Sequence, residues 1–275
     1  MSRKSARKRA IIRRRIFLST VALVLVLVIM AIVFVVKIAT KKPEKEKQNS
    51  SSSSNISSSS NVSSNASSKE ESKPKFVTLG EYKLDATYTE LLLVNDKNPL
   101  PENYKGNLIT IPQKYIKGEL NQIDKNVWPY LQAMFDNARK EGIDIGCWSP
   151  YRSYATQKWL FQRKINNLVS SGVSSAEAED KAATVVARPG TSEHQTGLAL
   201  DINSASSSFA KTDAYKWLCE NAEDYGFVER YTAEKQSKTG IIPESWHWRF
   251  VGINAAKEMN KLGYCLEEYV EYKNK

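Results

Sequence analysis

Two histidines, His194 and His247, are the only ones in this chain, and each stands beside a run that alternates in strand fashion. Residues 198–203 place apolar side chains on one face and Asp201 on the other, and the aromatic residues around His247 leave its imidazole on the opposite face. Imidazole and carboxylate are ordinary zinc ligands, and a catalytic zinc site takes three protein ligands. We therefore predict that His194, Asp201 and His247 converge on one metal ion, in preference to two isolated, hydrogen-bonded histidines.

The carboxylate of Glu244, three residues before His247, is a candidate general base. Three protein ligands leave a fourth metal position for water, and hydrolysis needs a group that takes the proton of that water. In a continuous strand, a spacing of three would put Glu244 on the wrong face. Pro243 makes the start of the strand irregular, so a turn at Glu244 and Ser245 would direct the carboxylate toward the metal. The alternative is a solvated surface glutamate.

Three further polar side chains are candidates for contacts with a substrate. Arg152 stands in a loop after a predicted strand, and a guanidinium fork suits a terminal carboxylate. Gln157 and Ser192 are polar groups that would line the same cleft. For each of the three, the alternative is a solvated side chain with no role in the site.

The elements that must position these side chains lie in the 200 residues from 76 to 275, enough for one domain with its own core. An extended arm is expected at 76–104, helices at 127–140, 154–169, 174–187, 213–225 and 253–262, and strands at 143–148, 198–203, 226–231 and 246–251. Because helices and strands do not alternate regularly, the predicted fold class is α+β, a single domain with a small antiparallel sheet flanked by helices.

The N-terminal segments predict a membrane anchor. Residues 1–15 carry eight positive charges and no acid, and residues 16–36 carry no charge. At about 1.5 Å per residue the second segment spans about 30 Å, the thickness of a bilayer core. It is longer than the apolar region of a secretory signal, so we expect an uncleaved transmembrane helix with a basic cytoplasmic tail. Residues 37–75, rich in serine, are expected to form a disordered linker that leaves residues 76–275 extracytoplasmic.

Charge separates these segments from the folded part. Residues 1–75 hold 16 basic and 4 acidic side chains, a net charge of +12, whereas residues 76–275 hold 24 and 26, a net charge of −2. The high pI therefore belongs to the anchor and linker, and no nucleic-acid partner is expected for the domain.

The chain has three cysteines, Cys147, Cys219 and Cys265, and no close pair among them. An odd number at wide spacing favours buried thiols. One disulfide is possible in an extracytoplasmic setting, but its partners cannot be assigned from the sequence.

Several motifs resemble one known family. The SxHxxGxAxD motif at residues 192–201, together with ESWH at residues 244–247, resembles the zinc D-alanyl-D-alanine carboxypeptidases of the VanY-like branch. YRSYxxQ at residues 151–157 and the run LVNDKNPLP at residues 93–101 are similar to the same branch. The resemblance covers roughly residues 91 to 264, and the paired histidine motifs are highly specific.

This resemblance implies a hedgehog/D,D-peptidase-like fold, a zinc cofactor and a role for each candidate residue. The implied roles are zinc ligands for His194, Asp201 and His247, general base for Glu244, and contacts to the peptide end for Arg152, Gln157 and Ser192. The implied reaction removes the C-terminal D-alanine from peptidoglycan stem peptides, with zinc-bound water as the nucleophile. The implied location is the cell membrane, crossed once, with the catalytic domain on the cell-wall side.

Two other functions stay open at this point. An L,D-carboxypeptidase acting on tetrapeptide stems would use much the same site, and a non-catalytic, zinc-stabilised cell-wall-binding module would need the metal ligands but no base. The sequence determines neither the oligomeric state nor whether the role is wall maturation, recycling or glycopeptide resistance.

Overall fold

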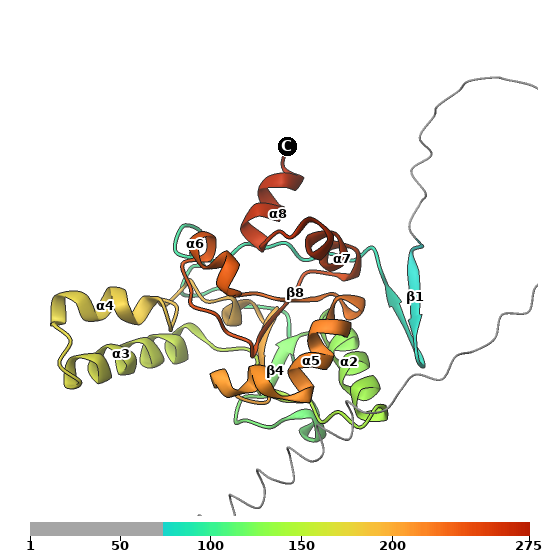
Figure 1. The fold of residues 1–275 in the computed structure, drawn as a ribbon, viewed down its shortest axis with the longest axis horizontal. Coiled ribbons are helices and arrows are strands. Elements are labelled where there is room, and N and C mark those ends of the chain that lie inside the picture. Colours follow the sequence, from blue (N-terminus) through green and yellow to red (C-terminus); the bar gives the residue numbers. More distant parts are fainter. Residues whose placement is uncertain (1–73) are drawn as a thin grey trace, which may run out of the picture. The chain divides into compact units, whose positions relative to one another are not determined.

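The computed structural model describes residues 74–275, an α+β unit of small antiparallel sheets surrounded by helices (Figure 1). The expected cytoplasmic tail and anchor, and the linker up to residue 73, lie outside the described residues. Within residues 74–275, no helix has the length and apolar character needed to cross a membrane.

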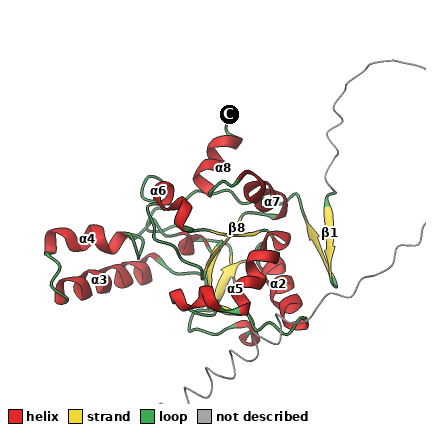
Figure 2. Cartoon of the chain, viewed as in Figure 1, coloured by secondary structure: helices red, strands yellow, loops and turns green. Residues whose placement is uncertain are grey.

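The elements follow one another as short strands and helices joined by long loops (Figure 2). The strands are β1 Phe76–Leu79, β2 Tyr82–Asp85, β3 Leu108–Thr110, β4 Gln122–Asp124, β5 Cys147–Ser149, β6 Ala199–Ile202, β7 Phe227–Glu229 and β8 His247–Phe250. The α-helices are α2 Trp128–Lys140, α3 Tyr154–Ser170, α4 Ser175–Ala183, α5 Asp213–Asn221, α6 Gln236–Thr239, α7 Ile253–Leu262 and α8 Leu266–Lys273. Short 3-10 helices occupy η1 Gln113–Tyr115, η2 Glu193–Thr196, η3 Ser207–Lys211, η4 Ala222–Tyr225 and η5 Ala233–Lys235.

A four-stranded antiparallel sheet, in the order β5-β6-β8-β7, forms the centre of the unit. Its register pairs Leu200 with Trp248 and Asp201 with His247. Because successive side chains of a strand point to opposite faces, the first pair enters the core and the second shares the other face. The sheet therefore brings two predicted metal ligands together as cross-strand neighbours.

Helix α2 covers the core face of this sheet. Its apolar stripe recurs at helical spacing, and Pro129 stands in the first turn, where a missing N–H costs little. The fully buried members of this core include Leu131, Met134 and Phe135 of the helix and Leu200 and Phe250 of the sheet. Each large apolar side chain buried in this way contributes about 1.5–3 kcal/mol, which holds the sheet rigid behind the candidate site.

A second apolar cluster joins α7 and α8 to the arm at residues 88–101. Leu91 and Leu93 of the arm pack against this cluster, which contains Met259 and Tyr269. Backbone hydrogen bonds extend the contact: the amide of Glu90 donates to Val251 (3.2 Å), and the arm reaches the loop before η2 through a bond of 2.7 Å from the amide of residue 100 to the carbonyl of residue 190. The predicted arm thus links the C-terminal helices to the loop that precedes η2, the element of His194.

The predicted helices at 127–140, 154–169, 213–225 and 253–262 are confirmed, the third of them as α5 followed by η4. The helix predicted at 174–187 ends early, at Ala183, because the carbonyl of Thr184 accepts a hydrogen bond from the amide of Ile242 (3.1 Å). The chain then leaves the helix axis, so that Val185 lines a cavity together with Ile241.

Three other expectations about the elements were wrong. The arm predicted from residue 76 begins instead as the β1–β2 hairpin. The strand expected at 143–148 forms only from Cys147, because the amide of Ile143 donates back to Ala138 (2.9 Å) and closes the end of α2. The described residues also contain two further two-stranded sheets, β1-β2 and β3-β4, where one small sheet was expected.

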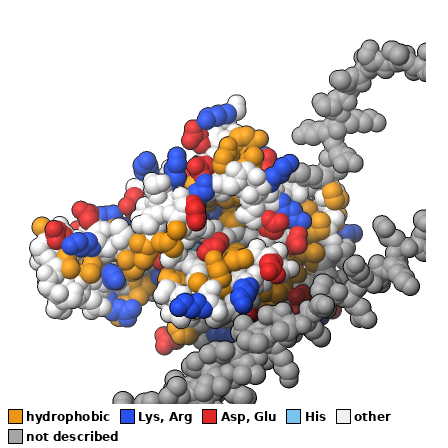
Figure 3. Space-filling view, viewed as in Figure 1, with side chains coloured by type: hydrophobic (Ala, Val, Ile, Leu, Met, Phe, Trp, Pro, Cys, Tyr) orange, Lys and Arg blue, Asp and Glu red, His pale blue; other side chains and the backbone are white. Residues whose placement is uncertain are grey.

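The three cysteines are free thiols, with Cys147 and Cys265 buried. Cys219 is exposed, so the expectation of a buried thiol was wrong at this position, because α5 turns it away from the core. Figure 3 shows basic and acidic side chains interspersed on one face of the described residues. That mixture agrees with the near-neutral charge expected for the folded part.

Replacing Gly252 by alanine is expected to destabilise the fold strongly. Gly252 has φ 95° and an added Cβ would overlap the carbonyl oxygen of Tyr88, so the arm would have to move away from β8. Gly172 offers a matched control, since it also has φ 95° but its Cβ would meet no atom within 4 Å. Gly172→Ala should cost about 1–3 kcal/mol of backbone strain, and Gly252→Ala clearly more. Urea unfolding of both variants measures the difference, and equal losses would contradict the close contact.

Candidate metal and catalytic site

The three predicted metal ligands come from η2, β6 and β8. His194 lies in the single turn of η2, which ends at Gly197 in the left-handed conformation (φ 75°). That conformation favours glycine and lets the chain reverse into β6, where Asp201 follows. His247 is the first residue of β8 and the cross-strand partner of Asp201. All three side chains are buried.

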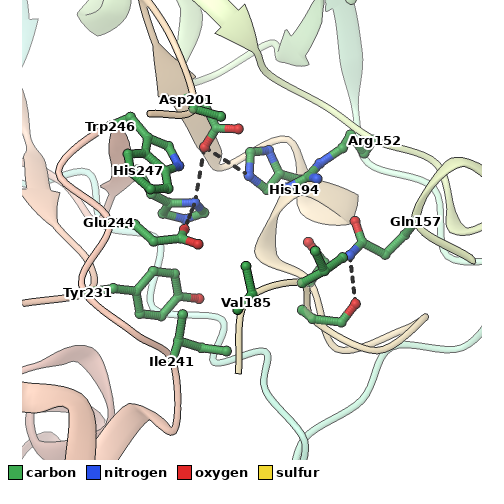
Figure 4. A pocket seen from close by; sticks show the side chains of 14 residues that line it. Arg152, Gln157, Val185, His194, Asp201, Tyr231, Ile241, Glu244, Trp246 and His247 are labelled. Carbon is green, nitrogen blue, oxygen red and sulfur yellow. Dashed lines mark hydrogen bonds and ion pairs between the residues drawn. The ribbon is translucent and has the colours of Figure 1, made fainter. Parts of the chain in front are cut away.

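The ligand atoms of these residues lie close enough together to share one ion. Oδ1 of Asp201 is 3.4 Å from Nε2 of His194 and 3.4 Å from Nδ1 of His247. Dashed lines mark both contacts in Figure 4. All three atoms lie within 4.8 Å of one another. Nε2 of His194 and Oδ1 of Asp201 are buried without a hydrogen-bond partner, which is costly unless something else satisfies them. Two imidazoles and one carboxylate in this arrangement fit zinc.

The outward nitrogen of each imidazole also faces an acceptor. Nδ1 of His194 lies 2.7 Å from the carbonyl oxygen of Pro150, and Nε2 of His247 lies 3.4 Å from Oε2 of Glu193. When these outward nitrogens carry the protons, Nε2 of His194 and Nδ1 of His247 are free to bind a metal ion.

Burial and the neighbouring charges separate the pKa values of the two histidines. Burial, reinforced by the positive charge of Arg152, lowers the pKa of His194 to about 4. Burial would also lower the pKa of His247, but its contacts with Asp201 and Glu193 outweigh burial and raise the pKa to about 9. Burial thus favours the neutral form of His194, whereas the neighbouring carboxylates favour a proton on His247.

Glu244 reaches the ligands through the turn expected from Pro243. The amide of His247 donates to the carbonyl of Glu244 (3.1 Å), and the amide of Glu244 donates to Tyr231 (2.9 Å). This turn brings Oε2 of Glu244 to 3.8 Å from Nδ1 of His247. Burial, followed by repulsion from Asp201, raises the pKa of Glu244 to about 7, although His247 opposes the shift. Such a carboxyl can both take and return a proton near neutral pH.

These side chains line one cavity of about 240 Å³. Figure 4 shows Arg152 and Gln157 on the side of His194, with Glu244 and Tyr231 across the opening. Ser192, placed in the same cavity wall, is also buried. The structure thus brings all seven residues singled out in the sequence to one cavity.

Two of the candidate substrate contacts have unused hydrogen-bonding atoms. Nε of Arg152 is buried without a partner, and so is Oε1 of Gln157, whose Nε2 donates to the carbonyl of Ala187 (2.7 Å). A donor and an acceptor left unsatisfied in the same cavity are suited to hold the polar end of a ligand.

Comparison with known proteins gives a consistent result. The family model for VanY, D-alanyl-D-alanine carboxypeptidase, matches residues 120–253. A D-alanyl-D-alanine carboxypeptidase of Enterococcus faecalis is 42% identical over 180 residues, which cover 66% of this chain and 65% of that protein. Among solved structures, a mutant of the vancomycin-resistance D,D-pentapeptidase VanY in complex with Zn(II) has 41% identity and a TM-score of 0.58, covering 66% of this chain and 98% of that one. The chain belongs to the VanY family.

Two further solved structures are similar to this chain. VanYB in complex with D-alanine-D-alanine has 40% identity and a TM-score of 0.58, covering 66% of this chain and 97% of that one. The LdcB LD-carboxypeptidase has 36% identity and the same TM-score, covering 71% of this chain and 92% of that one. The chain thus covers nearly the full length of these solved structures. It covers less than two thirds of the length of the Enterococcus faecalis relative.

Two groups of residues at the site of this VanY-family chain were not predicted from the sequence. Tyr231 lines the cavity, and its ring centroid lies 4.8 Å from that of His247. Glu193, Arg230 and Arg249 form a buried charged cluster behind His247. Charged residues are usually solvent-exposed, so nothing in the sequence indicated that these three lie in the interior. The one available signal was that Arg249 follows His247 by two residues in a strand, which places both on the same face.

Proposed function

We propose that this chain is a zinc-dependent D-alanyl-D-alanine carboxypeptidase that removes the C-terminal D-alanine from peptidoglycan stem peptides. The observation that carries the proposal is one cavity that joins a His-Asp-His ligand set to a carboxyl with a pKa near 7 and an arginine across the opening. VanYB, 40% identical over the matched part, has been solved with D-alanine-D-alanine, which supports the same substrate class here.

In this proposal His194, Asp201 and His247 hold the zinc ion. Zinc in such a site supplies a Lewis acid that polarises a carbonyl group and lowers the pKa of water. The single carboxylate among the ligands leaves the site with a net positive charge when zinc is bound, which suits a developing oxyanion.

Glu244 acts as the general base in the proposed mechanism. Its carboxylate takes a proton from the attacking water and then delivers it to the amine of the departing D-alanine, as the C–N bond breaks. Burial in the cavity wall holds the carboxyl close to the ligands and gives it a pKa suited to both transfers.

Arg152, Gln157 and Ser192 bind the peptide end in the proposed complex. The guanidinium of Arg152 pairs with the free carboxylate, and Gln157 offers its unused Oε1 to an N–H of the substrate. Because this anchor lies across the opening from Glu244, a peptide held by its C-terminus would present its last peptide bond between the two.

The proposed setting is the outer face of the cell membrane. Residues 16–36 would anchor the chain, residues 37–75 would act as a flexible linker, and the domain would work on the cell wall. About 39 residues of flexible linker give a root-mean-square reach of about 35 Å, enough to move the cavity over nearby wall strands.

Mass spectrometry of the products tests this function. The purified chain, loaded with zinc, is incubated separately with a pentapeptide stem ending in D-Ala-D-Ala, the same peptide with a C-terminal amide, and a tetrapeptide stem. We expect loss of one alanine from the pentapeptide only, because the amide removes the carboxylate that Arg152 would bind. Equal cleavage of the amide would remove Arg152 from the proposed recognition.

The L,D-carboxypeptidase alternative has a specific observation in its favour, the TM-score of 0.58 to LdcB. Loss of alanine from the tetrapeptide alone would favour that activity and reject ours. If the chain binds zinc but leaves all three peptides intact, the non-catalytic wall-binding module becomes the better description.

A further inference from the structure

Glu193 holds a buried carboxylate at the edge of His247 that points away from the cavity. The residue precedes a candidate ligand, His194, in the single turn of η2, and its side chain has no exposed surface. Oε2 of Glu193 lies 3.4 Å from Nε2 of His247, whereas Nδ1 of the same ring faces Asp201 and Glu244. The imidazole of His247 is thus held between carboxylates on two edges.

Two arginines fix the position of this carboxylate. Nε of Arg230 donates to Oε1 of Glu193 at 2.8 Å, and Nη1 of Arg249 donates to the same oxygen at 3.0 Å. Both arginines are buried, and so their contacts with Glu193 are shielded from water and salt. With Oε1 taken by the guanidinium groups, Oε2 remains for His247.

Each arginine is itself tied to a distant part of the chain. Arg230 donates to both carboxylate oxygens of Glu267 on α8, at 2.9 and 2.6 Å. Arg249 donates to the backbone carbonyls of Glu90 (3.2 Å) and Leu92 (2.9 Å) in the arm. Arg230 and Arg249 are thus each held at a second point, by α8 and by the arm, and each arginine contacts Oε1 of Glu193 directly.

We propose that Glu193 is the positioning residue for His247, acting through its contact with the outward nitrogen. By accepting from Nε2–H it selects the tautomer with a free Nδ1 and aims that nitrogen at the point that Asp201 and His194 share. The inference rests on the proposed metal site and adds to it a requirement for a buried, arginine-held carboxylate. A carboxylate–histidine contact of this kind typically changes metal affinity by 10–100-fold.

A purely structural role is the competing explanation. Buried arginines need a counter-charge, and removing Glu193 would leave two of them uncompensated whether or not His247 depends on it. Stability alone cannot separate the two roles, whereas zinc affinity and the tautomer of His247 can.

The test compares Glu193→Gln with Glu267→Gln in the full chain. Both variants remove one carboxylate from Arg230, but only the first alters the contact with His247. Zinc dissociation constants are measured by competition with a chromogenic chelator. We expect Glu193→Gln to weaken zinc binding 10–100-fold and Glu267→Gln to leave it unchanged. Equal dissociation constants in the two variants would overturn the proposal.

Glu193→Asp provides a second variant in case the glutamine variant does not fold. It keeps the charge that Arg230 and Arg249 require but shortens the reach toward His247. A positioning role predicts weaker zinc binding in this variant too. Wild-type affinity in Glu193→Asp would mean that only the charge matters, and would reject the proposed contact.

Nitrogen-15 spectra of the histidine side chains give a readout independent of affinity. With only two histidines in the chain, the zinc-loaded protein should show one imidazole with its proton on Nδ1, His194, and one with its proton on Nε2, His247. If both imidazoles carried their proton on Nδ1, the proposed role of Glu193 would be contradicted.

These outcomes are separate from the proposed reaction. If the chain cleaves the peptide but the Glu193 variants bind zinc like the wild type, only the positioning role is overturned. If the Glu193 variants bind zinc more weakly but the wild-type chain cleaves no peptide, only the proposed reaction is overturned. A wild-type chain that binds no zinc would overturn both.

Discussion

Glu244→Gln is expected to remove most of the hydrolytic activity while leaving zinc bound. The amide keeps the size of the side chain and its place in the turn before β8, but it cannot take a proton from water. Because general-base catalysis contributes about 10²–10⁴-fold, we expect kcat to fall by that factor. The zinc content should stay at the wild-type level, since Glu244 is not one of the three proposed ligands.

Glu234→Gln is the matched control for that variant. Glu234 is an exposed glutamate of the same segment between β7 and β8, and it does not line the cavity. Its replacement should change neither zinc content nor turnover of the pentapeptide. Unchanged turnover in Glu244→Gln itself would remove this residue from the mechanism and leave the cavity without its proposed base.

Asp201→Asn is expected to lose most of the zinc affinity and, with it, the activity. Oδ1 of Asp201 approaches both histidines, at 3.4 Å from a ring nitrogen of each. The amide has a similar shape but no charge, so we expect a loss at least as large as the ~100-fold upper end for contacts outside the ligand set.

Thermal unfolding with and without zinc measures this effect independently of catalysis. Zinc at 100 times its dissociation constant should stabilise the wild-type chain by about 2.7 kcal/mol, and the same zinc concentration should stabilise Asp201→Asn far less. Asp144→Asn is the control, because the side chain of Asp144 is exposed and forms an ion pair with Lys117, away from the proposed ligands. An equal zinc response in Asp201→Asn and the wild type would exclude Asp201 as a ligand.

The helices of this fold were largely predictable because their information is local. The apolar stripe of α2, and Gly226 after η4, each mark an element within one stretch of chain. The β1–β2 hairpin had a local signal too, since Gly80 adopts φ 62° between two alternating runs, but a two-residue turn is easily read as part of an extended arm. The early end of α4 had none, because it depends on a hydrogen bond from Ile242, far away in the sequence.

The sequence alone determined which residues are able to do the chemistry. Two histidines, an aspartate at strand spacing and a glutamate beside a proline are specified by residue type and by short distances along the chain, and a strand pattern is enough to say which face each side chain takes. The arginine, the glutamine and the serine were proposed as polar groups suited to bind a substrate, and the resemblance of motifs implied the same role. All seven lie at one cavity in the structure.

Only the tertiary structure decided how these residues are held. The pairing of Asp201 with His247 depends on the register between β6 and β8, which hydrogen bonds between distant segments set. The carboxylate of Glu193 is buried because Arg249 of β8 and Arg230, which follows β7, come together to neutralise it. A charge enters a protein interior only when its partners are present, and those partners are brought together by the fold, so no local pattern in the chain could reveal them.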